Sequence, residues 1–372
     1  MQKIRILIAT HAPLSSESGA GQVAINLAEE FRKQGHDVTL WSPHPMPHLP
    51  RWWQQVENVQ LMRAKLDKFL DSQEAFDVID CMGSLITKKV SRSASVVVCR
   101  SVQPVILYIV SDLLNPKDKG LKKIGLFIFN VLFGLFCIFL SLQGWSRATY
   151  ILCLGSLELE WMKKWFPWWR NKLLVYLHAI SNDERSELTK IRLNRKQQER
   201  EEIRFIWIGR WVAHKGIKKL VKFILQREIS NPQDTFTIAG GGDSPEQDFP
   251  SELIQSGKLK IIPSFKRNEL YSLLANHDVG LFTSEVEGWG LTLNEMLESG
   301  LPVFATKAGG VPDLQPFFET LMPFPPPEYF IPTFLDSSQL LEDYYASYNW
   351  EKIAETYAEV LIKKLDFNNN CQ

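Results

Sequence analysis

The sequence predicts an α/β protein with two doubly wound units, and three observations carry this prediction. The chain has 372 residues, which at roughly 150 residues per domain suggests two or three domains. Short apolar stretches alternate with amphipathic stretches at helical spacing, which is the pattern of parallel strands connected by helices. The alternation is interrupted by the charged segment Arg185–Arg204 and then starts again.

The first unit opens on a continuous apolar run, Ile4–Ala9, which is typical of a strand buried on both faces. Gln22–Gln34 has helical periodicity, and Gly35 follows as the expected helix stop because glycine accepts a positive φ. Asp37–Ser42 is the next strand, so the opening predicts a right-handed β-α-β unit. Further short strands are expected at Phe76–Asp80, Ser95–Cys99 and Thr149–Leu154.

The second unit follows a segment that is rich in Lys, Arg, Glu and Gln, for which we predict a linker or exposed helix over 183–203. Its expected strands are Phe205–Ile208, Thr235–Ala239, Lys260–Ile262, Val279–Thr283 and Pro302–Thr306, with helices at Gly216–Arg227, Glu269–Asn276 and Leu291–Ser299. The predicted boundaries are therefore 1–182, 183–203 and 204–348. Residues 349–372 form an amphipathic helix that caps the second domain or crosses back to the first. Ligands of such sheets bind at the carboxyl ends of the strands, and we expect them in the cleft between the two Rossmann-like domains.

Charge and cysteine content exclude several classes of protein. Lys+Arg and Asp+Glu both number 42, whereas a nucleic-acid binder normally carries a basic excess. The five cysteines are scattered, which predicts neither a disulfide framework nor a zinc site and fits a reducing compartment. The first apolar stretch, of about six residues, is too short for a signal peptide. We therefore expect a cytoplasmic protein.

The segment Ser284–Leu314 follows an expected strand and opens a helix near Leu291. The backbone N–H groups at such a helix start have no intrahelical partner and form an anion site. Gly288 and Gly290 allow the backbone to approach a ligand closely. Two carboxylates accompany this turn, Glu287 just before it and Glu295 in the first turns of the helix. A lone pattern of this kind more often gives a loop residue and a carboxylate that complements the helix dipole.

Three further segments strengthen the case for a ligand site. GRWVAHKG (Gly209–Gly216) places Arg210 and Lys215 at a strand-to-helix turn, where two cations suit a diphosphate. AGGGDSPE (Ala239–Glu246), with Gly241 at its centre, follows another strand end. A glycine pair also lies in AGGVPD (Ala308–Asp313).

Together these segments resemble the retaining glycosyltransferases of the large E-x7-E family, the glycosyl transferases group 1, which have the GT-B fold. The E-x7-E signature is present as Glu287 to Glu295, and the G-R-x-x-x-x-K-G segment as Gly209 to Gly216. The N-terminal pattern of the family is present from Gly21 to Val38. The resemblance covers most of the chain, is specific in the second half and is loose between residues 45 and 180.

The resemblance implies a role for each matching residue. Arg210 and Lys215 would bind the donor diphosphate and stabilise the charge that builds on it, while Glu287 would contact the donor sugar as a catalytic residue. Glu295 would hold the ribose hydroxyls. The remaining donor-binding residues would be Gly19, Gly21, Gly209, Gly241, Ser264, Phe265, Gly288, Trp289, Gly290 and Leu291, of which Ser264 and Phe265 would meet the nucleotide base.

The implied activity is transfer of a hexose from a nucleotide-diphosphate sugar, such as a UDP- or GDP-hexose, to an acceptor hydroxyl with retention of the α configuration. The acceptor would be a saccharide or a lipid-linked sugar of lipopolysaccharide, exopolysaccharide or glycolipid synthesis. The chain contains no Asp-x-Asp pair, so two cations and a helix start would replace a divalent metal, and we expect no metal and no cofactor.

Departures from the family pattern keep other classes open. Where many relatives have a histidine that contacts the donor sugar, this chain has Val98–Pro104, in which Arg100 or Gln103 is the candidate substitute. His178 stands in place of an asparagine-glycine turn and is more often structural in such a position. A noncatalytic sugar-nucleotide-binding or scaffold protein at a membrane is the alternative. Gly19–Ala24 matches a dinucleotide fingerprint, but the acidic residue expected after the second strand is missing, so NAD binding is not expected. His44 and His48 lie among prolines, which prevent the helix that would align them as metal ligands.

A membrane contact is predicted from the first domain. Ile124–Leu142 is almost wholly apolar and would suffice in length for a membrane span, but a crossing would separate strands of one sheet. The alternatives are a fully buried helix and a helix that dips into one leaflet. Four lysines precede it (Lys117, Lys119, Lys122, Lys123), and Trp161–Arg170 interleaves aromatics with cations. We therefore expect peripheral contact through 117–142 and 161–170, at the inner face of the membrane.

Overall fold

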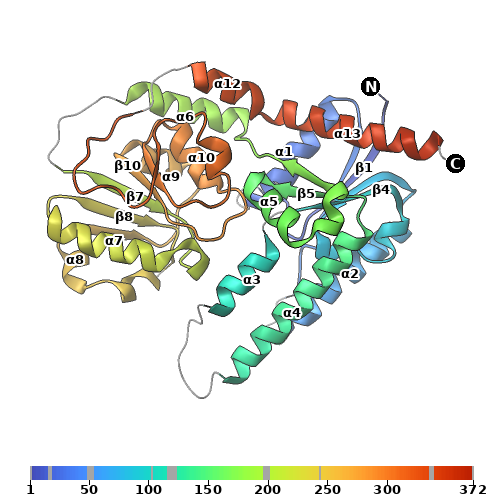
Figure 1. Ribbon diagram of the computed structural model, residues 1–372, viewed down its shortest axis with the longest axis horizontal. Helices are drawn as coiled ribbons and strands as arrows, with labels where there is room; N and C mark the ends of the chain where they lie inside the picture. Colours follow the sequence, from blue (N-terminus) through green and yellow to red (C-terminus); the bar gives the residue numbers. More distant parts are fainter. Residues whose placement is uncertain are drawn as a thin grey trace. The chain divides into compact units, whose positions relative to one another are not determined.

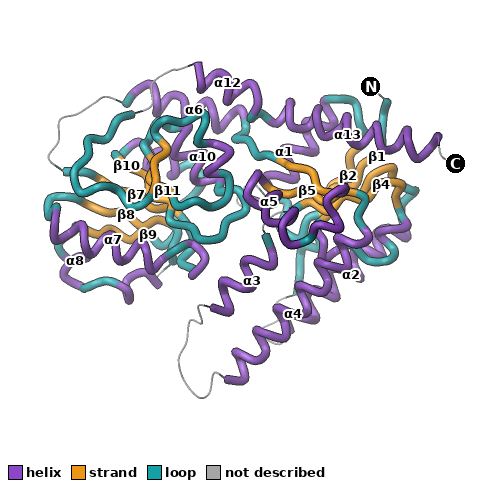
Figure 2. Tube along the Cα trace, in the orientation of Figure 1, coloured by secondary structure: helices purple, strands orange, loops and turns teal. Residues whose placement is uncertain are grey.

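The computed structural model describes residues 2–15, 19–47, 54–101, 104–114, 124–195, 202–242, 244–334 and 339–370. The chain forms two compact units, one of residues 1–178 together with 350–372 and the other of residues 179–349. Each unit contains a six-stranded sheet in which every pairing is parallel. Figures 1 and 2 show the two sheets and the helices around them. The predicted fold class of two doubly wound α/β units is confirmed.

Unit 1 has the strand order β2-β1-β3-β4-β5-β6. The strands are β1 (Arg5–Ala9), β2 (Asp37–Trp41), β3 (Phe76–Cys81), β4 (Ala94–Arg100), β5 (Tyr150–Leu154) and β6 (Leu173–Tyr176). Helices α1 (Gly19–Lys33) and α13 (Trp350–Asn370) pack side by side. The core on the other face takes side chains from α2 (Gln55–Asp71), α4 (Ile124–Arg147) and α5 (Gly155–Trp165), and α3 (Val105–Leu114) packs against α4.

Helix α13 belongs to unit 1 although it follows unit 2 in the chain. Its Tyr357 packs against Phe31 of α1, with ring centroids 5.6 Å apart. The hydroxyl of Tyr357 also donates a hydrogen bond to Asp80 Oδ2 at 2.9 Å, at the end of β3. The helix is thus held by both apolar packing and a buried polar contact.

Unit 2 has the strand order β12-β11-β10-β7-β8-β9. The strands are β7 (Arg204–Ile208), β8 (Thr235–Ala239), β9 (Leu259–Ile262), β10 (Val279–Phe282), β11 (Val303–Ala305) and β12 (Leu321–Pro323). Its helices are α6 (Asn182–Asn194), α7 (Ile217–Ser230), α8 (Ser251–Gln255), α9 (Glu269–Ala275), α10 (Leu291–Glu298), α11 (Val311–Leu314) and α12 (Gln339–Ser347).

The predicted linker over 183–203 requires a correction. Residues 182–194 form α6, which packs against α9 and α10 as part of unit 2. Arg192 of this helix is buried and donates to the carbonyl of Glu298 at 3.0 Å. Of the two structures that the charged residues indicated, a linker and an exposed helix, the chain forms a helix, and several of its charged residues bind groups of unit 2 instead of facing water. Residues 196–201 lie outside the described part of the chain.

Little of helix α4 is fully buried, and several of its large apolar side chains are exposed. Among the described residues it is the one helix that is long and apolar enough to span a membrane, by length and composition, and 17% of its apolar window is buried. Of the two alternatives for this segment, a fully buried helix does not fit the part that projects from unit 1 (Figure 1). Lys117, Lys119, Lys122 and Lys123 lie outside the described residues.

One buried carboxyl in unit 1 makes stability dependent on pH. Glu158 of α5 accepts hydrogen bonds from the Leu154 N–H at 2.6 Å and the Ser101 hydroxyl at 2.7 Å, but burial raises its pKa to about 7. A carboxyl with a raised pKa favours the folded state in acid, and this contribution is lost as the pH rises through about 7.

We expect Glu158→Gln to stabilise the protein relative to wild type at pH 8 by about 2 kcal/mol and to give no gain at pH 5. The amide keeps an acceptor for the Leu154 N–H and removes the buried charge. Urea unfolding at both pH values measures the difference, with the exposed Glu160→Gln on the same helix as the control. An equal effect of Glu158→Gln at the two pH values would contradict the assignment.

Candidate active site

Two predicted residues meet at the point where the strand order of unit 2 reverses. From β7 the chain continues to β8 and β9 on one side, whereas β10, β11 and β12 lie on the other side. The carboxyl ends of β7 and β10 lie side by side at this reversal, which is the part of an open parallel sheet where ligands bind. Lys215 follows β7, Glu287 follows β10, and the two side chains form an ion pair across this point.

The electrostatics of Glu287 depend on this pairing. Burial alone would raise the pKa of the carboxyl, but the charge of Lys215 and hydrogen bonds from Lys215 and Ser284 outweigh it, so the net pKa is lowered. Ser284 Oγ donates to Glu287 Oε2 at 3.1 Å. The structure thus holds Glu287, whose side chain is 10% exposed, as an anion next to a cation.

The loops after β7 and β10 are bonded to each other by their backbones. The N–H groups of Glu285 and Val286 both donate to the carbonyl of His214, at 2.8 and 3.2 Å. The Thr283 hydroxyl donates to the carbonyl of Lys215 at 2.8 Å and accepts from the indole of Trp207 at 3.1 Å. These bonds fix the backbone on both sides of the ion pair.

Gly216 makes this close approach possible. It has φ of 71°, and a Cβ placed there would lie 1.8 Å from the carbonyl oxygen of Thr283. We expect Gly216→Ala to lower the free energy of unfolding by at least about 3 kcal/mol, since it adds a backbone clash to an unfavourable φ.

Gly257→Ala is the matched control, because Gly257 has φ of 78° with nothing within 4 Å of its added Cβ. Gly257→Ala should lower the free energy of unfolding by only about 1 kcal/mol. Chemical denaturation of both variants measures the difference, and equal losses would mean that the contact with Thr283 relaxes freely.

The start of α10 presents its backbone at the same edge. Gly290 has φ of 94° and precedes Leu291, the first residue of the helix, so the turn depends on glycine. Trp289, a predicted donor-binding residue, lies in this turn. Its indole is buried and donates to Asn294 Oδ1 at 2.8 Å, and Gly310 N–H donates to its carbonyl at 2.8 Å. The bulky ring is most stable inside the unit, where it supports the turn.

Glu295 is buried and shares a cation with a second carboxylate. Its Oε1 lies 2.6 Å from Nη2 of Arg267, which also contacts Glu184 Oε1 at 2.6 Å. Burial raises the pKa of Glu295 although Arg267 opposes the shift. Its other oxygen, Oε2, is buried and has no hydrogen-bond partner among the described residues. A buried acceptor without a partner is costly, and a ligand hydroxyl would satisfy it.

The remaining predicted residues fall in both units. Arg210 is exposed after β7, Gly209 donates to the Ala239 carbonyl at 2.9 Å, and Gly241 and Gly288 are buried. Ser264 is exposed after β9, and Phe265 lies next to it, with its ring 3.3 Å from the Cβ position of Gly240. Gly19 and Gly21 start α1 in unit 1, where a Cβ on Gly21 would lie 2.2 Å from the Pro13 carbonyl oxygen.

Arg100, a candidate substitute for the family's histidine, is buried in unit 1. Its Nε donates to Asp80 Oδ1 at 2.9 Å. His178 is also buried, and burial followed by the charge of Arg100 lowers its pKa to about 3, so the ring is neutral. Gln103 and His48 lie outside the described residues. Sequence reasoning missed Arg267, although a cation five residues after an expected strand was a usable signal.

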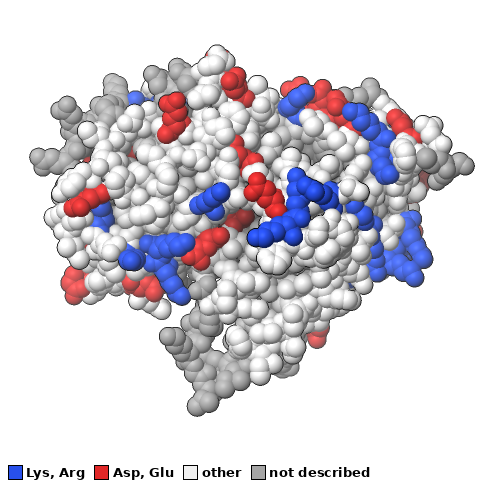
Figure 3. Space-filling view, viewed as in Figure 1, with Lys and Arg blue, Asp and Glu red and all other residues white. Residues whose placement is uncertain are grey.

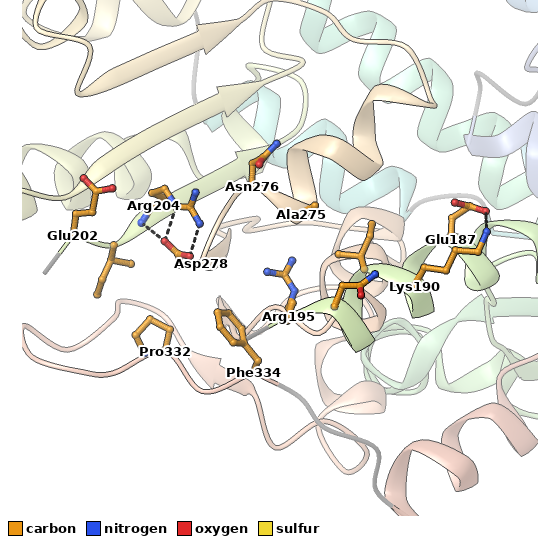
Figure 4. A pocket seen from close by; sticks show the side chains of 13 residues that line it. Glu187, Lys190, Arg195, Glu202, Arg204, Ala275, Asn276, Asp278, Pro332 and Phe334 are labelled. Atoms are coloured by element: carbon orange, nitrogen blue, oxygen red, sulfur yellow. Dashed lines mark hydrogen bonds and ion pairs between the residues drawn. The ribbon is translucent and has the colours of Figure 1, made fainter. Parts of the chain in front are cut away.

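Unit 2 also has a concavity whose lining includes Arg195, Arg204 and Asp278 (Figure 4). Its charged groups serve the fold. Arg204 binds Asp278 with two hydrogen bonds of 2.8 and 2.9 Å, and Arg195 donates to the backbone carbonyls of Leu274, His277 and Ser299. Because Arg204 opens β7, this concavity is at the amino ends of the strands, where parallel sheets seldom bind ligands. The residues that the structure describes contain no cluster of three or more His, Cys, Asp or Glu side chains that could hold a metal ion.

The two doubly wound units make this a GT-B fold, the fold of its structural neighbours. Residues 190–316 match the family model of the Glycosyl transferases group 1. This match includes Arg210, Lys215, Glu287 and Glu295.

The chain is also similar in sequence to individual glycosyltransferases. The chain is 30% identical over 132 residues to the sulfoquinovosyl transferase SQD2 of Arabidopsis thaliana, which is 36% of this chain and 24% of that protein. It is 26% identical over 176 residues to the phosphatidylinositol N-acetylglucosaminyltransferase gpi3 subunit of Schizosaccharomyces pombe, covering 44% and 38%. The chain therefore spans well under half the length of these relatives.

Two solved structures resemble the whole chain. Sucrose-phosphate synthase from Thermosynechococcus elongatus has a TM-score of 0.64 at 14% identity, over 96% of this chain and 98% of that one. Anabaena HepE, in complex with UDP and glucose, has a TM-score of 0.54 at 15% identity, over 96% and 99%. At these identities the likeness establishes the fold.

Proposed function

We propose that the protein is a glycosyltransferase that moves a hexose from a nucleotide-diphosphate sugar to an acceptor hydroxyl with retention of configuration. The observation that carries the proposal is the group of Lys215, Glu287 and the start of α10 at the switch point of unit 2. The match to the glycosyl transferases group 1 over these residues supports it.

The charges of the site suit the chemistry of a diphosphate leaving group. Breaking the glycosidic bond places negative charge on the diphosphate, and preorganised cations and helix N–H groups stabilise that charge without a metal. Lys215 and Arg210 supply the cations, and the amides of Gly290 and Leu291 supply the dipole. Glu295 Oε2, which is buried and has no described partner, suits a ribose hydroxyl. The HepE neighbour holds UDP and glucose, which favours a uridine donor.

We propose a saccharide or lipid-linked acceptor in lipopolysaccharide, exopolysaccharide or glycolipid synthesis, at the cytoplasmic side of a membrane. The name of the gpi3 relative indicates an activity on phosphatidylinositol, which supports a lipid acceptor.

A noncatalytic sugar-nucleotide-binding protein is the second candidate. It is favoured by the burial of Arg100, which is bonded to Asp80 and so does not replace the sugar-contacting histidine.

Titration calorimetry with UDP-, GDP- and ADP-hexoses tests the proposal on wild type, Arg210→Ala and Glu287→Ala. We expect one donor class to bind and both variants to bind it at least about tenfold more weakly. Lys222→Ala, an exposed cation on α7, is the control. Absence of binding by any donor to the folded protein would overturn the proposal. Binding without release of the nucleotide in the presence of lipid-linked or saccharide acceptors would favour the noncatalytic candidate.

A further inference from the structure

An apolar stripe runs along the exposed part of α4. Ile128, Leu132, Leu135 and Phe139 are 52%, 60%, 57% and 59% exposed. Their spacing of four, three and four residues places them on one face of the helix, over a length of roughly 16 Å. No Asp, Glu, Lys or Arg occurs between Ile124 and Ser146, and the surface over α4 is correspondingly white in Figure 3.

The stripe is part of a larger apolar surface of unit 1. Helix α3 packs on α4 so closely that a Cβ on Gly134 would lie 2.7 Å from Ile109, and α3 exposes Val110 and Leu114. Nine of the sixteen exposed large apolar side chains of the described residues lie on α3, α4 and the segment Trp165–Trp168. Such a concentration is unusual for the surface of a soluble monomer.

The fold itself requires only the other end of α4. There Gly144 approaches unit 1 so closely that a Cβ would lie 2.0 Å from the Gly83 carbonyl oxygen, and Leu140 and Trp145 are buried. The residues from Phe127 to Phe139 extend beyond this anchor (Figure 1). The exposed stripe is therefore not explained by packing within unit 1.

Aromatic and basic side chains adjoin the anchored end. The ring of Trp145 contacts Phe166 and Trp169, with centroids 5.2 and 5.7 Å apart. In the same segment Trp165 and Trp168 are 58% and 68% exposed. Lys163, Lys164 and Arg170 are exposed beside them. Exposed tryptophans among cations are the composition that proteins place at lipid headgroups.

We infer that unit 1 docks on an anionic lipid bilayer, with α4 lying in the headgroup plane, its stripe toward the acyl chains and Lys163, Lys164 and Arg170 at the lipid phosphates. Anionic lipid is favoured over a second copy of the chain because two copies joined at this face would bring the same cations together, whereas lipid phosphates neutralise them. The docking stands apart from the transfer reaction, since none of these residues belongs to the candidate active site. It would hold the enzyme at a surface that carries lipid-linked hydroxyls.

Vesicle flotation of the purified protein tests this inference without measuring transfer. Wild type is expected to float with vesicles of phosphatidylcholine and phosphatidylglycerol and much less with phosphatidylcholine alone. The stripe variant Ile128→Ser/Leu132→Ser/Leu135→Ser/Phe139→Ser should bind both kinds of vesicle at least about tenfold more weakly than wild type. Lys163→Glu/Lys164→Glu should lose about tenfold on the anionic vesicles only.

The control Leu193→Ser/Ile229→Ser/Ile331→Ser removes apolar side chains of unit 2 that are 68% to 80% exposed. It should float as wild type does. Thermal melting close to that of wild type confirms that each variant is folded. Flotation of the stripe variant equal to wild type would overturn the inference. So would the absence of flotation of wild type together with a dimer, seen by analytical ultracentrifugation, that the stripe variant abolishes.

Discussion

Replacing Lys215 with alanine is expected to lower the rate of sugar transfer by at least about 100-fold. The change removes a cation placed where the donor diphosphate is proposed to bind. It also leaves Glu287 buried without its ion-pair partner, which costs more than the loss of an exposed charge. Steady-state kinetics with the donor found by calorimetry measure the change, and kcat should fall more than KM rises because the charge on the diphosphate grows in the transition state.

The matched control is Lys219→Ala. Lys219 lies four residues further along the chain and is paired with Glu285 at 3.1 Å, but its side chain is 49% exposed. It should leave kcat within about twofold of wild type, as exposed ion pairs contribute little. Equal losses in the two variants would indicate a general effect of charge and would contradict the role of Lys215.

Lys215→Ala removes a cation from the proposed diphosphate site and also leaves Glu287 without its ion-pair partner. The pH dependence of stability distinguishes the second effect from the first. Without the lysine, burial raises the pKa of Glu287, since burial is the largest influence on this carboxyl. A raised pKa in the folded state means that the variant loses stability as the pH rises through that pKa. Lys215→Ala/Glu287→Gln removes the buried charge and should recover stability at high pH but not activity.

Local patterns predicted most of the strands and the central part of the site. Parallel strands buried on both faces are short apolar runs, so Ile4–Ala9 and Phe205–Ile208 were visible in the sequence. Lys215 and Glu287 lie in the loops that follow two such runs, and parallel topology places both at one edge of the sheet. The pattern near Glu287 alone favoured a loop residue, and the roles of both residues came from the resemblance to a known family.

Contacts between distant segments could not be predicted in the same way. Arg267 forms ion pairs with Glu184 of α6 and Glu295 of α10. No residue near Arg267 in the sequence indicates that these two carboxylates are its partners. Trp289 stands between two glycines, and nothing in this pattern indicates that its indole is buried and bonded to Asn294. The direction of a side chain depends on the packing around it, which periodicity does not reveal.

The burial of Arg100 in unit 1 leads to the second large expected effect, on stability. Its guanidinium bonds Asp80, whose other oxygen accepts from Tyr357 of α13. Burial alone would lower the pKa of Arg100, but Asp80 reverses this and the net pKa is raised. We expect Arg100→Ala to lower the free energy of unfolding by about 3–5 kcal/mol, because it leaves Asp80 as a buried charge without a partner. Urea denaturation measures the loss, with the exposed Arg92→Ala as the control.

The double variant Arg100→Met/Asp80→Asn distinguishes a structural Arg100 from one that acts on the donor sugar. Removing both charges eliminates the unpaired anion, and the amide keeps an acceptor for Tyr357, so most of the lost stability should return. If Arg100 only anchors α13 and the sheet, the folded double variant should keep kcat within a few-fold of wild type. A stable double variant with a loss of about 100-fold in kcat would show instead that Arg100 replaces the missing histidine, and the burial of its side chain would then have to change when the donor binds.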